Sequence, residues 1–221
     1  MTRILVLRPQ PGAAATVERA QALGLESVAI PLFEVEAVEW EAPDPAGFDG
    51  LLLTSANAVR FGGEALNALL GLKVYSIGQA TAEAARNAGF AVAATGDAGV
   101  ERLLKSIEPG LKLLHLCGED RREAGGATQQ ISRVTVYCAT PVEAPNLDPA
   151  ENTIALIHSP RAGRRFAELV RERGTIAIAA ISQEAADAVD RGWRAVEVAP
   201  LPTDEALLAL AARLCNKPDP E

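Results

Sequence analysis

The chain has 221 residues, of which 48% are hydrophobic and 23% charged, a composition that predicts one large or two small folded domains rather than a disordered chain. Its formal net charge is -8 and it holds no lysine- or arginine-rich run, so we expect no nucleic acid among its partners. No apolar stretch approaches the roughly 18 residues of a membrane span, so we expect no membrane contact either.

Short apolar runs alternate with helical patterns along almost the whole chain. Continuous apolar strands separated by helices predict parallel sheets that are covered on both faces. The predicted strands are Arg3–Arg8, Glu26–Ile30, Leu51–Thr54, Lys73–Ile77, Ala91–Ala94, Lys112–Leu116, Arg133–Cys138, Thr153–His158, Thr175–Ile181 and Ala195–Val198. The predicted helices are Ala13–Leu23, Asn57–Leu70, Ala80–Ala88, Gly99–Ile107, Arg121–Ile131, Gly163–Arg173, Gln183–Arg191 and Asp204–Leu214.

Two separated motifs occur twice in the chain. LLLTSANAVRF from Leu51 aligns with ALIHSPRAGRR from Ala155, and IGQATAEAARNAGF from Ile77 aligns with ISQEAADAVDRGW from Ile181. Both alignments have the same offset of 104 positions, the difference between 77 and 181. One offset across two motifs indicates a duplication. Two similar α/β units would place similar turn-plus-helix surfaces opposite each other, and a cleft between paired domains is a natural ligand site.

The domain boundaries follow from the number of predicted strands. The stretch from Gly50 to Cys138 has five, enough for one doubly wound sheet, whereas the stretch from Thr153 onward has only three. Its two missing strands are available at the N-terminus. We therefore predict an α/β fold of two similar doubly wound parallel-sheet domains joined by a two-stranded β hinge. The predicted ranges are 1–34 plus 143–221 for the discontinuous first domain, 39–136 for the inserted second, and 35–38 and 137–142 for the hinge strands.

The alternative is a chain of two consecutive domains divided near residue 145. That division would leave the second domain with three strands and open sheet edges, which makes it the weaker interpretation. The hinge segments FEVEAV and YCATPV alternate or carry β-branched residues, which favours a strand pair.

Several familiar chemistries have no support in the sequence. Neither glycine-rich nucleotide-binding motif occurs, and there is no G-x-S-x-G nucleophile elbow. His115 and Cys117 share a strand face, but no other ligand has a recognisable spacing from them, so a core histidine and a buried thiol are favoured over a metal site. His158 at a strand end is weak evidence of acid–base chemistry. We expect neither a metal nor a cofactor.

Small hydroxyl and amide residues gather in four strand-to-helix turns. In open parallel sheets these turns lie at the carboxyl ends of the strands, where ligands bind, and the accessible N–H groups of helix N-termini suit carboxylates or phosphates. The alternative is ordinary helix capping with no ligand involved. The turns are Thr54-Ser55-Ala56-Asn57, Gly78-Gln79-Ala80-Thr81, Cys117-Gly118 and Ser159-Pro160-Arg161.

At these turns the chain resembles the uroporphyrinogen-III synthase family, and the resemblance covers nearly its whole length. The family motifs are individually loose, but their order and spacing together are fairly specific. They are LLLTSANAV from Leu51, IGQATAEAARNAG from Ile77, LHLCGEDRRE from Leu114, VTVYCATP from Val134, HSPRA from His158 and APLPTDEALL from Ala199. The resemblance implies two α/β domains joined by a β-ladder.

The resemblance also implies a cofactor-free cyclisation. The linear tetrapyrrole hydroxymethylbilane loses its hydroxyl, the resulting azafulvene attacks the substituted carbon of the terminal pyrrole, and a spiro intermediate fragments and recloses. The product is uroporphyrinogen III, in which ring D is inverted, whereas uncatalysed closure gives the type I isomer. The substrate is therefore expected to be a small molecule that carries carboxylate side chains.

Roles for individual residues come from the same resemblance. Tyr137 matches the family's hinge tyrosine and is the candidate proton donor, because a phenol is protonated at neutral pH; its alternative role is packing. Hydroxyls, helix N-termini and arginines, Arg121 among them, would bind carboxylates. The candidate substrate-binding residues are Arg8, Thr54, Ser55, Asn57, Ala58, Gly78, Thr81, Cys117, Gly118, Arg122, Ser159, Pro160, Arg161 and Ser182.

One turn departs from the family pattern. Where the family often has Gly-x-Thr-Thr, this chain has Ser182-Gln183-Glu184-Ala185, and Glu184 would repel a substrate carboxylate if it faced the site.

A second interpretation is a non-catalytic, two-domain hinged binding protein for an anionic metabolite, which would share the fold and the turn chemistry. Three widely spaced cysteines indicate reduced thiols, and the N-terminus enters a strand pattern at once rather than a signal peptide. We therefore expect a cytoplasmic monomer.

Overall fold

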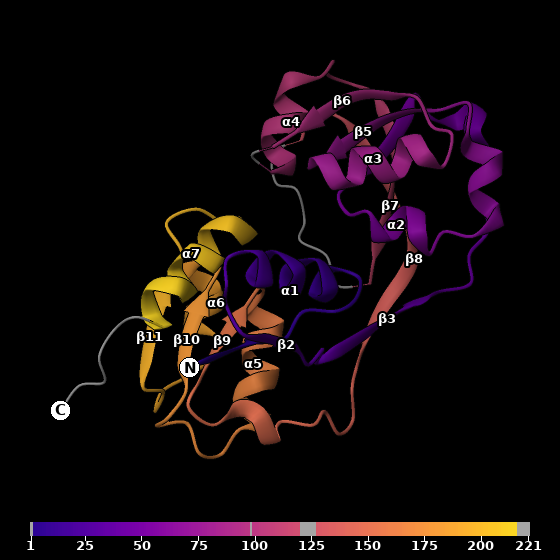
Figure 1. The fold of residues 1–221 in the computed structure, drawn as a ribbon. Helices are drawn as coiled ribbons and strands as arrows, with labels where there is room; N and C mark the ends of the chain where they lie inside the picture. The colour runs from indigo at the N-terminus through magenta and orange to yellow at the C-terminus, as the bar shows by residue number, and fades with distance from the viewer. Residues whose placement is uncertain (1, 98, 120–126, 216–221) are drawn as a thin grey trace. The chain divides into compact units, whose positions relative to one another are not determined.

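The computed structural model describes residues 2–97, 99–119 and 127–215. The chain divides into two compact units, Met1–Glu34 with Thr140–Glu221 (unit 1) and Val35–Ala139 (unit 2). Each unit contains a parallel sheet with helices packed on it (Figure 1). The predicted α/β fold class is confirmed. No helix within the described ranges is long and apolar enough to span a membrane.

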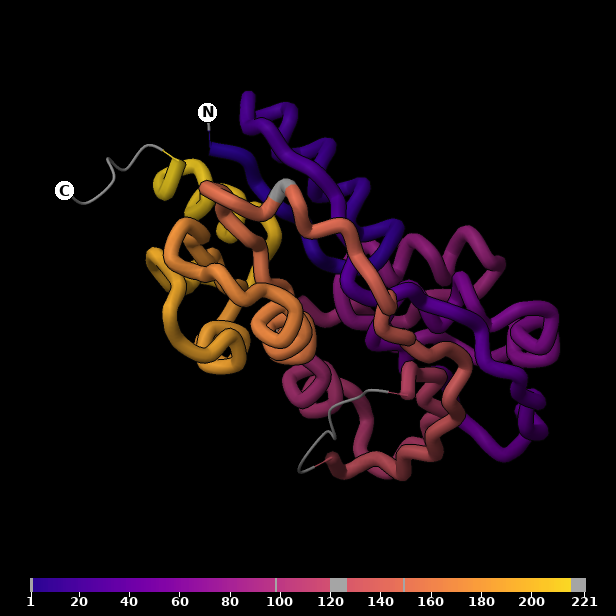
Figure 2. Tube along the Cα trace, turned by 90° about the horizontal axis from the view of Figure 1, so that it is seen from below, coloured from indigo at the N-terminus to yellow at the C-terminus, as the bar shows by residue number. Residues whose placement is uncertain are grey.

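The sheet of unit 1 combines strands from both ends of the chain. Its order is β11-β10-β9-β1-β2, and all neighbours are parallel. Figure 2 shows the N-terminal segment running beside the C-terminal part of the chain. The strands are β1 (Arg3–Val6), β2 (Ser27–Ala29), β9 (Thr153–Ile157), β10 (Ala177–Ala180) and β11 (Ala195–Val198).

Helices cover both faces of this sheet because successive strand residues point to opposite sides. Ile4, Val6 and Leu156 pack on one face in an apolar cluster with residues of α1 (Gly12–Ala22) and α7 (Asp204–Cys215). Helices α5 (Pro160–Leu169) and α6 (Gln183–Asp187) also pack against the strands, and Phe166 of α5 stacks on Trp193 with ring centroids 5.2 Å apart. A short 3₁₀ turn, η3 (Asp148–Ala150), precedes β9.

The sheet of unit 2 has the order β3-β8-β7-β4-β5-β6. Strands β8, β7, β4, β5 and β6 are parallel to one another. The strands are β3 (Phe33–Ala37), β4 (Gly50–Leu53), β5 (Lys73–Ile77), β6 (Val92–Gly96), β7 (Lys112–Gly118) and β8 (Gln130–Pro141).

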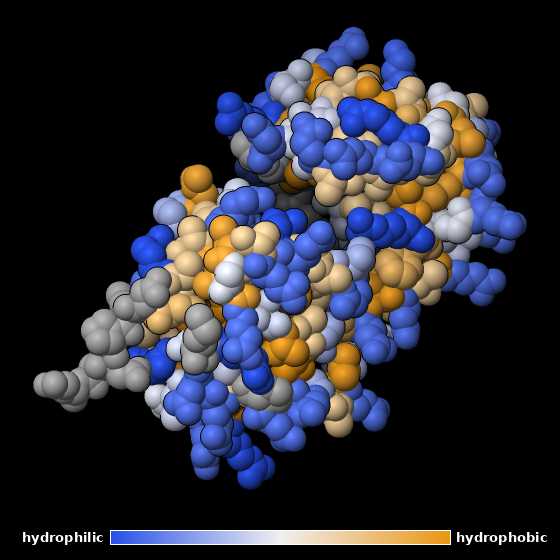
Figure 3. All heavy atoms as spheres, in the orientation of Figure 1, coloured by the Kyte–Doolittle hydropathy of each residue, from blue (hydrophilic) through white to orange (hydrophobic). Residues whose placement is uncertain are grey.

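The helices of unit 2 also cover both faces of their sheet. Helices α2 (Asn57–Arg60) and α3 (Gln79–Asn87) and the 3₁₀ helix η2 (Glu64–Leu69) share an apolar cluster with Leu51 and Leu53 of β4. Leu52, between those two residues, packs with α4 (Val100–Ser106) in a separate cluster. A 3₁₀ turn, η1 (Pro45–Gly47), precedes β4. On the face shown in Figure 3, hydrophilic residues are interspersed with hydrophobic ones on both units.

The strands β3 and β8 contain the two connections between the units. The Val38 N–H donates to the Val136 carbonyl (3.1 Å), and the Val142 N–H donates to the Leu32 carbonyl (3.0 Å). The residue numbers therefore run in opposite directions, so this pair is antiparallel. The β-branched residues of both segments suit such a ladder.

The predicted helix Asn57–Leu70 is wrong, because two glycines interrupt it. Helix α2 ends at Arg60, and Gly63 adopts a φ of 63°, a left-handed conformation that favours glycine. A Cβ on Gly62 would lie 2.7 Å from the Ala58 carbonyl oxygen, so the chain passes too closely there for any other residue. The segment then continues as the separate helix η2.

Three other predicted helices need correction. Residues 130 and 131, at the end of the predicted helix Arg121–Ile131, belong to β8, while residues 120–126 lie outside the described part of the chain. Helix α5 begins earlier than predicted, at Pro160, because Ser159 caps it, and it ends at Leu169. Helix α6 spans only five residues, and Asp190 beyond it has a φ of 62°.

The duplication seen in the sequence extends to the order of the strands. Strands β4, β5 and β6 occupy the same relative positions in unit 2 as β9, β10 and β11 in unit 1, and β7 and β8 stand where β1 and β2 do. The offset of 104 also pairs Val100 with Asp204, which are the first residues of α4 and α7. The two units therefore share one scaffold, and differences between equivalent residues are informative.

Candidate functional site

Each unit has one point at which neighbouring parallel strands continue in opposite directions across the sheet. In unit 1, β1 and β9 are neighbours, and the chain continues from β1 to β2 on one side of this pair and from β9 to β10 on the other. In unit 2, β4 and β7 are neighbours, and the chain continues from β4 to β5 on one side and from β7 to β8 on the other. The carboxyl ends of strands at such a point form the usual ligand site of open α/β sheets. We call the residues that follow β1, β9, β10 and β11 the unit 1 edge, and those at the carboxyl ends of β4, β5 and β7 the unit 2 edge.

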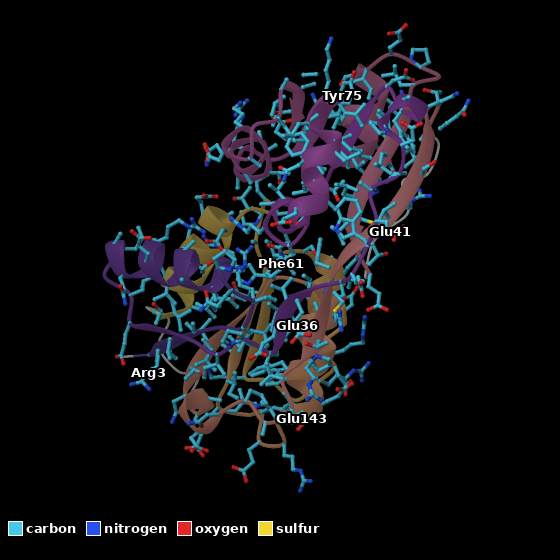
Figure 4. All side chains as sticks on the ribbon, turned by 90° about the vertical axis from the view of Figure 1, so that its right-hand side faces the viewer. Arg3, Glu36, Glu41, Phe61, Tyr75 and Glu143 are labelled. Atoms are coloured by element: carbon cyan, nitrogen blue, oxygen red, sulfur yellow. The ribbon has the colours of Figure 1, made fainter. Side chains whose placement is uncertain are left out.

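At the unit 2 edge, the Tyr137 ring lies against Gly118. A Cβ on Gly118 would come within 2.6 Å of Tyr137 Cε2 and 3.0 Å of its Oη, so only glycine allows the ring to occupy this position. The Phe61 ring, labelled in Figure 4, also packs near the Tyr137 ring, with a centroid distance of 6.4 Å. The described part of the chain provides no hydrogen bond to the Tyr137 hydroxyl. The phenol is therefore fixed by packing while its hydroxyl stays available.

Cys117 and Gly118 were expected in a turn but are the last residues of β7. The strand extends to Gly118 because β8 continues to pair with it, through a register shift, as far as Tyr137. The Cys117 side chain is buried, and its thiol contacts the Val134 carbonyl (3.6 Å). Their roles in substrate binding stay predictions.

The turn after β4 holds three of the candidate polar residues. Thr54 Oγ1 lies 3.0 Å from Nε2 of the buried His115, so this histidine belongs to the edge. Ser55 Oγ accepts a hydrogen bond from the Asn57 N–H (3.2 Å), and Asn57 begins α2. Ala58 points into the apolar core, so only its backbone is available to a ligand.

The turn after β5 is shaped by Gly78, which precedes α3 with a φ of 78°. Nothing lies within 4 Å of where its Cβ would be, so the space beside it at the start of the helix is open. Its own N–H donates to the Gly96 carbonyl (2.8 Å), which leaves the N–H groups of the first two residues of α3 for a ligand. Thr81 in the first turn of α3 is only 5% exposed. This turn therefore offers backbone N–H groups rather than prominent side chains.

At the unit 1 edge, two serines cap helices. Ser159 Oγ accepts from the Ala162 N–H (3.2 Å) at the start of α5, and Ser182 Oγ accepts from the Ala185 N–H (3.3 Å) at the start of α6. The capping alternative is therefore realised at both positions. A hydroxyl that accepts a backbone hydrogen bond still has its own proton to donate, so a capping serine can also bind a carboxylate.

The first turn of α5 also carries Pro160 and Arg161. Pro160 occupies the first helical position, where its missing N–H costs nothing. The Arg161 guanidinium lies 4.3 Å from the centroid of the Phe33 ring. Arg122 lies outside the described residues, as does Arg121.

Asp204 is the centre of a polar network at the unit 1 edge. Its carboxylate accepts hydrogen bonds from Thr16 Oγ1 (2.9 Å), from Arg19 Nε and Nη2 (2.9 and 2.6 Å) and from His158 Nε2 (2.8 Å). Arg8 Nη1 lies 3.5 Å from the same carboxylate. Three separate segments, the end of β1 with α1, the end of β9, and α7, thus meet at one side chain.

Electrostatics fixes the protonation of this network. Burial alone would raise the pKa of Asp204, but the hydrogen bonds from His158 and Arg19 outweigh it and hold that pKa well below its usual range. Burial lowers the pKa of His158, and the hydrogen bond to Asp204 offsets only part of this effect. The histidine is therefore neutral at pH 7, and we assign its proton to Nε2 because a carboxylate can only accept.

Sequence reasoning missed most of this network. Arg8 was selected as a binding residue and His158 was noted at a strand end, but Thr16, Arg19 and Asp204 were not connected to them. Thr16 and Asp204 are 188 positions apart, and no local pattern reports such a contact. Among the described residues, no group of three or more His, Cys, Asp or Glu side chains could hold a metal ion.

Comparison with known proteins gives one consistent family. A family model described as uroporphyrinogen-III synthase HemD matches residues 14–209. A curated uroporphyrinogen-III synthase of Chlorobaculum parvum is 39% identical over 62 residues, which is 28% of this chain and 25% of the relative. That match therefore spans only a quarter of the relative's length.

Two solved structures share the fold. Uroporphyrinogen-III synthetase from Helicobacter pylori superposes with a TM-score of 0.68 at 20% identity, covering 97% of this chain and all of the other. A mutant uroporphyrinogen III synthase from Thermus thermophilus gives a TM-score of 0.54 at 16% identity, covering 98% and 100% of the two chains. At these identities the likeness concerns the fold alone.

Gly118→Ala is expected to lower the free energy of unfolding by about 1–3 kcal/mol, because the new methyl group overlaps the Tyr137 ring. Gly71→Ala is the matched control in the same unit, since nothing lies within 4 Å of its Cβ position. Its effect should stay within about 0.5 kcal/mol. Urea denaturation measures both, and equal stability of the two variants would contradict the packing described for Tyr137.

Proposed function

The chain belongs to the uroporphyrinogen-III synthase family, and from this we propose that it cyclises hydroxymethylbilane to uroporphyrinogen III with loss of water and inversion of ring D. The observation that carries the proposal is the family match over residues 14–209. That range includes the unit 2 edge completely, and the unit 1 edge apart from the residues before position 14, Arg8 among them. The enzyme would be a cyclising lyase of tetrapyrrole biosynthesis.

The donors at the two edges suit a substrate with many carboxylates. The protein has a formal net charge of -8, so its overall field repels such a substrate and binding needs local donors. Hydroxyls of Ser55, Ser159 and Ser182, and the N–H groups of the first two residues of α3 after Gly78, provide neutral donors at helix starts. In our proposal these groups and Arg8 bind the carboxylates, and Thr54 and Thr81 add further hydroxyls.

Positioning is the main catalytic contribution in this proposal. The uncatalysed bilane closes to the type I isomer, so the enzyme must hold the terminal pyrrole with its substituted carbon facing the azafulvene. Orientation of this kind can lower a barrier by about 7–11 kcal/mol. A site made of many carboxylate contacts at rigid strand ends provides such orientation without a cofactor in the proposed reaction.

The departing hydroxyl needs one proton, and we assign its donation to Tyr137. Three features support this choice: the phenol sits at the carboxyl end of β7, Gly118 and Phe61 fix its ring, and its hydroxyl has no partner in the described part of the chain. General acid catalysis of this kind contributes about 10²- to 10⁴-fold.

The proposal extends to the setting of the enzyme, a cytoplasmic monomer. The three free cysteines, Cys117, Cys138 and Cys215, support the compartment, because free thiols are typical of a reducing one.

The purified protein is expected to direct bilane, generated in situ by a bilane-forming enzyme, to the type III isomer with no added metal or nucleotide. Products are oxidised to porphyrins and the isomers are separated by chromatography. A type I fraction equal to that of the reaction without protein would overturn the enzymatic proposal and leave the non-catalytic binding protein as the remaining interpretation.

Tyr137→Phe keeps the ring against Gly118 and removes only the hydroxyl, so the melting temperature should stay within a few degrees of wild type. Turnover should fall by about 10²- to 10⁴-fold if the phenol protonates the leaving hydroxyl. Thr81→Ala is the comparison, because loss of one binding hydrogen bond costs about 0.5–1.5 kcal/mol. Near-normal turnover of Tyr137→Phe, with unchanged melting, would assign the tyrosine to packing alone.

A further inference from the structure

Arg8 is held by the Asp204 network but uses few of its donors there. Its Nη1 contacts Thr16 Oγ1 and Asp204 Oδ1, each at 3.5 Å, whereas Arg19 makes two short hydrogen bonds to Oδ2 of the same carboxylate. Nε and Nη2 of Arg8 have no hydrogen-bond partner among the described residues. A guanidinium has five N–H donors in a planar fork that matches a carboxylate, so most of this fork is available.

The glycine at the start of α1 leaves room for the Arg8 side chain. A Cβ on Gly12 would lie 2.6 Å from Nε and 2.8 Å from Cζ of Arg8, so the guanidinium lies directly against the start of α1. Its side chain is 35% exposed, so part of it is open to solvent. The Arg8 side chain thus lies against the backbone at Gly12 and contacts Thr16 and Asp204, yet part of it remains accessible.

The charges of the network leave one positive charge unbalanced. Arg8 and Arg19 are cations, Asp204 is an anion, and His158 is neutral at pH 7 because its burial lowers its pKa. The short contacts of Arg19 and His158 take most of the lone pairs of the carboxylate. Arg8 is therefore the cation that an additional carboxylate can bind.

Unit 2 builds the same scaffold without this network. At the offset of 104, Val100 stands where unit 1 has Asp204, and Thr54 stands where unit 1 has His158. Val100 packs beside the apolar cluster of α4. Since an apolar residue serves at the start of that helix, the fold does not require a buried carboxylate there, and another reason for Asp204 is needed.

We propose that Asp204 is a positioning residue that holds Arg8 at the unit 1 edge to bind one carboxylate of the substrate. Asp204 and Thr16 anchor Nη1, the short hydrogen bonds from Arg19 and His158 keep the carboxylate in place, and the remaining N–H donors of Arg8 are available to the substrate. This inference rests on the proposed function, because it takes the substrate to be a polycarboxylate tetrapyrrole.

The test uses uroporphyrin III, a stable polycarboxylate relative of the proposed product, as the binding probe, with dissociation constants measured by fluorescence titration of the full chain. Asp204→Asn should weaken binding about tenfold, the effect of one charge-assisted hydrogen bond. Glu205→Gln is the matched control, since it removes the same charge from the same helical turn at an exposed position. Removal of a negative charge by itself favours an anionic ligand, so Glu205→Gln should leave binding unchanged or slightly tighter.

A double-mutant cycle with Arg8→Gln separates positioning from a structural role. If Asp204 acts through Arg8, then Asp204→Asn should weaken binding in the wild-type background and have almost no effect in the Arg8→Gln background. Turnover adds a second readout: KM should rise with little change in kcat, because a contact made equally in the ground state and the transition state contributes to binding alone. Tighter or unchanged binding by Asp204→Asn, an equal loss in both backgrounds, or a loss confined to kcat would overturn the inference.

Two further conditions make every result of this binding experiment interpretable. The proposed function is judged first, on whether wild type forms the type III isomer; if it does not, that function and this inference both fall. Should Asp204→Asn fail to fold, Thr16→Val replaces it, because it removes the hydroxyl between Arg8 and Asp204 but keeps both charges. Thr16→Val should weaken binding several-fold only when Arg8 is present, and the same loss in the Arg8→Gln background would contradict the inference.

Discussion

Parallel pairing is the constraint on which the rest of this structure depends. It brings the carboxyl ends of the parallel strands of each sheet to the same side, and at one point in each unit the chain leaves neighbouring strands in opposite directions. The turns there begin helices, so unpaired backbone N–H groups and capping hydroxyls gather at the same edge. An acidic chain thereby obtains two local regions suited to carboxylates. The fit between this acidic protein and a substrate with many carboxylates therefore depends on these two regions rather than on the overall charge.

The duplication explains why the two edges resemble each other, and the residues that differ indicate separate tasks. Unit 2 has Thr54 and Val100 where unit 1 has His158 and Asp204. In unit 2 a tyrosine hydroxyl is held in position by packing, whereas in unit 1 an arginine is held in position by a carboxylate. A substrate that must be bound at many carboxylates and protonated at one place needs this kind of division. In our proposal, one scaffold used twice thus provides a proton donor in unit 2 and a positively charged binding group in unit 1.

Much of the fold could be predicted from the sequence, because buried parallel strands are continuous apolar runs. The predicted bounds of Lys73–Ile77 and Ala195–Val198 are those of β5 and β11. Prediction failed where the backbone conformation ends a helix that the pattern of side chains would continue. The segment from Asn57 to Leu70 has the side-chain pattern of one helix, but Gly62 and Gly63 interrupt it. The prediction of a turn at Gly118 was wrong because pairing with β8 extends the strand.

The site was predictable in part, for a physical reason. Turn residues can be recognised by type, since Ser159 and Ser182 are good helix caps, and a strand end places them at the edge. The Asp204 network has no such signal, because its members come from distant segments and meet only in the folded unit. The binding and catalytic roles of all these residues stay predictions, since they depend on the substrate.

Hydrogen exchange measured by mass spectrometry, with and without saturating uroporphyrin III, tests most directly whether the strand-end edges of both units bind the tetrapyrrole. The account predicts slower exchange in residues 8–19 and 158–166 of unit 1 and in residues 54–61 and 78–84 of unit 2. It predicts little change in residues 64–70, in η2, and 205–215, in α7. Protection confined to one unit, or located away from the carboxyl ends of the strands, would contradict it.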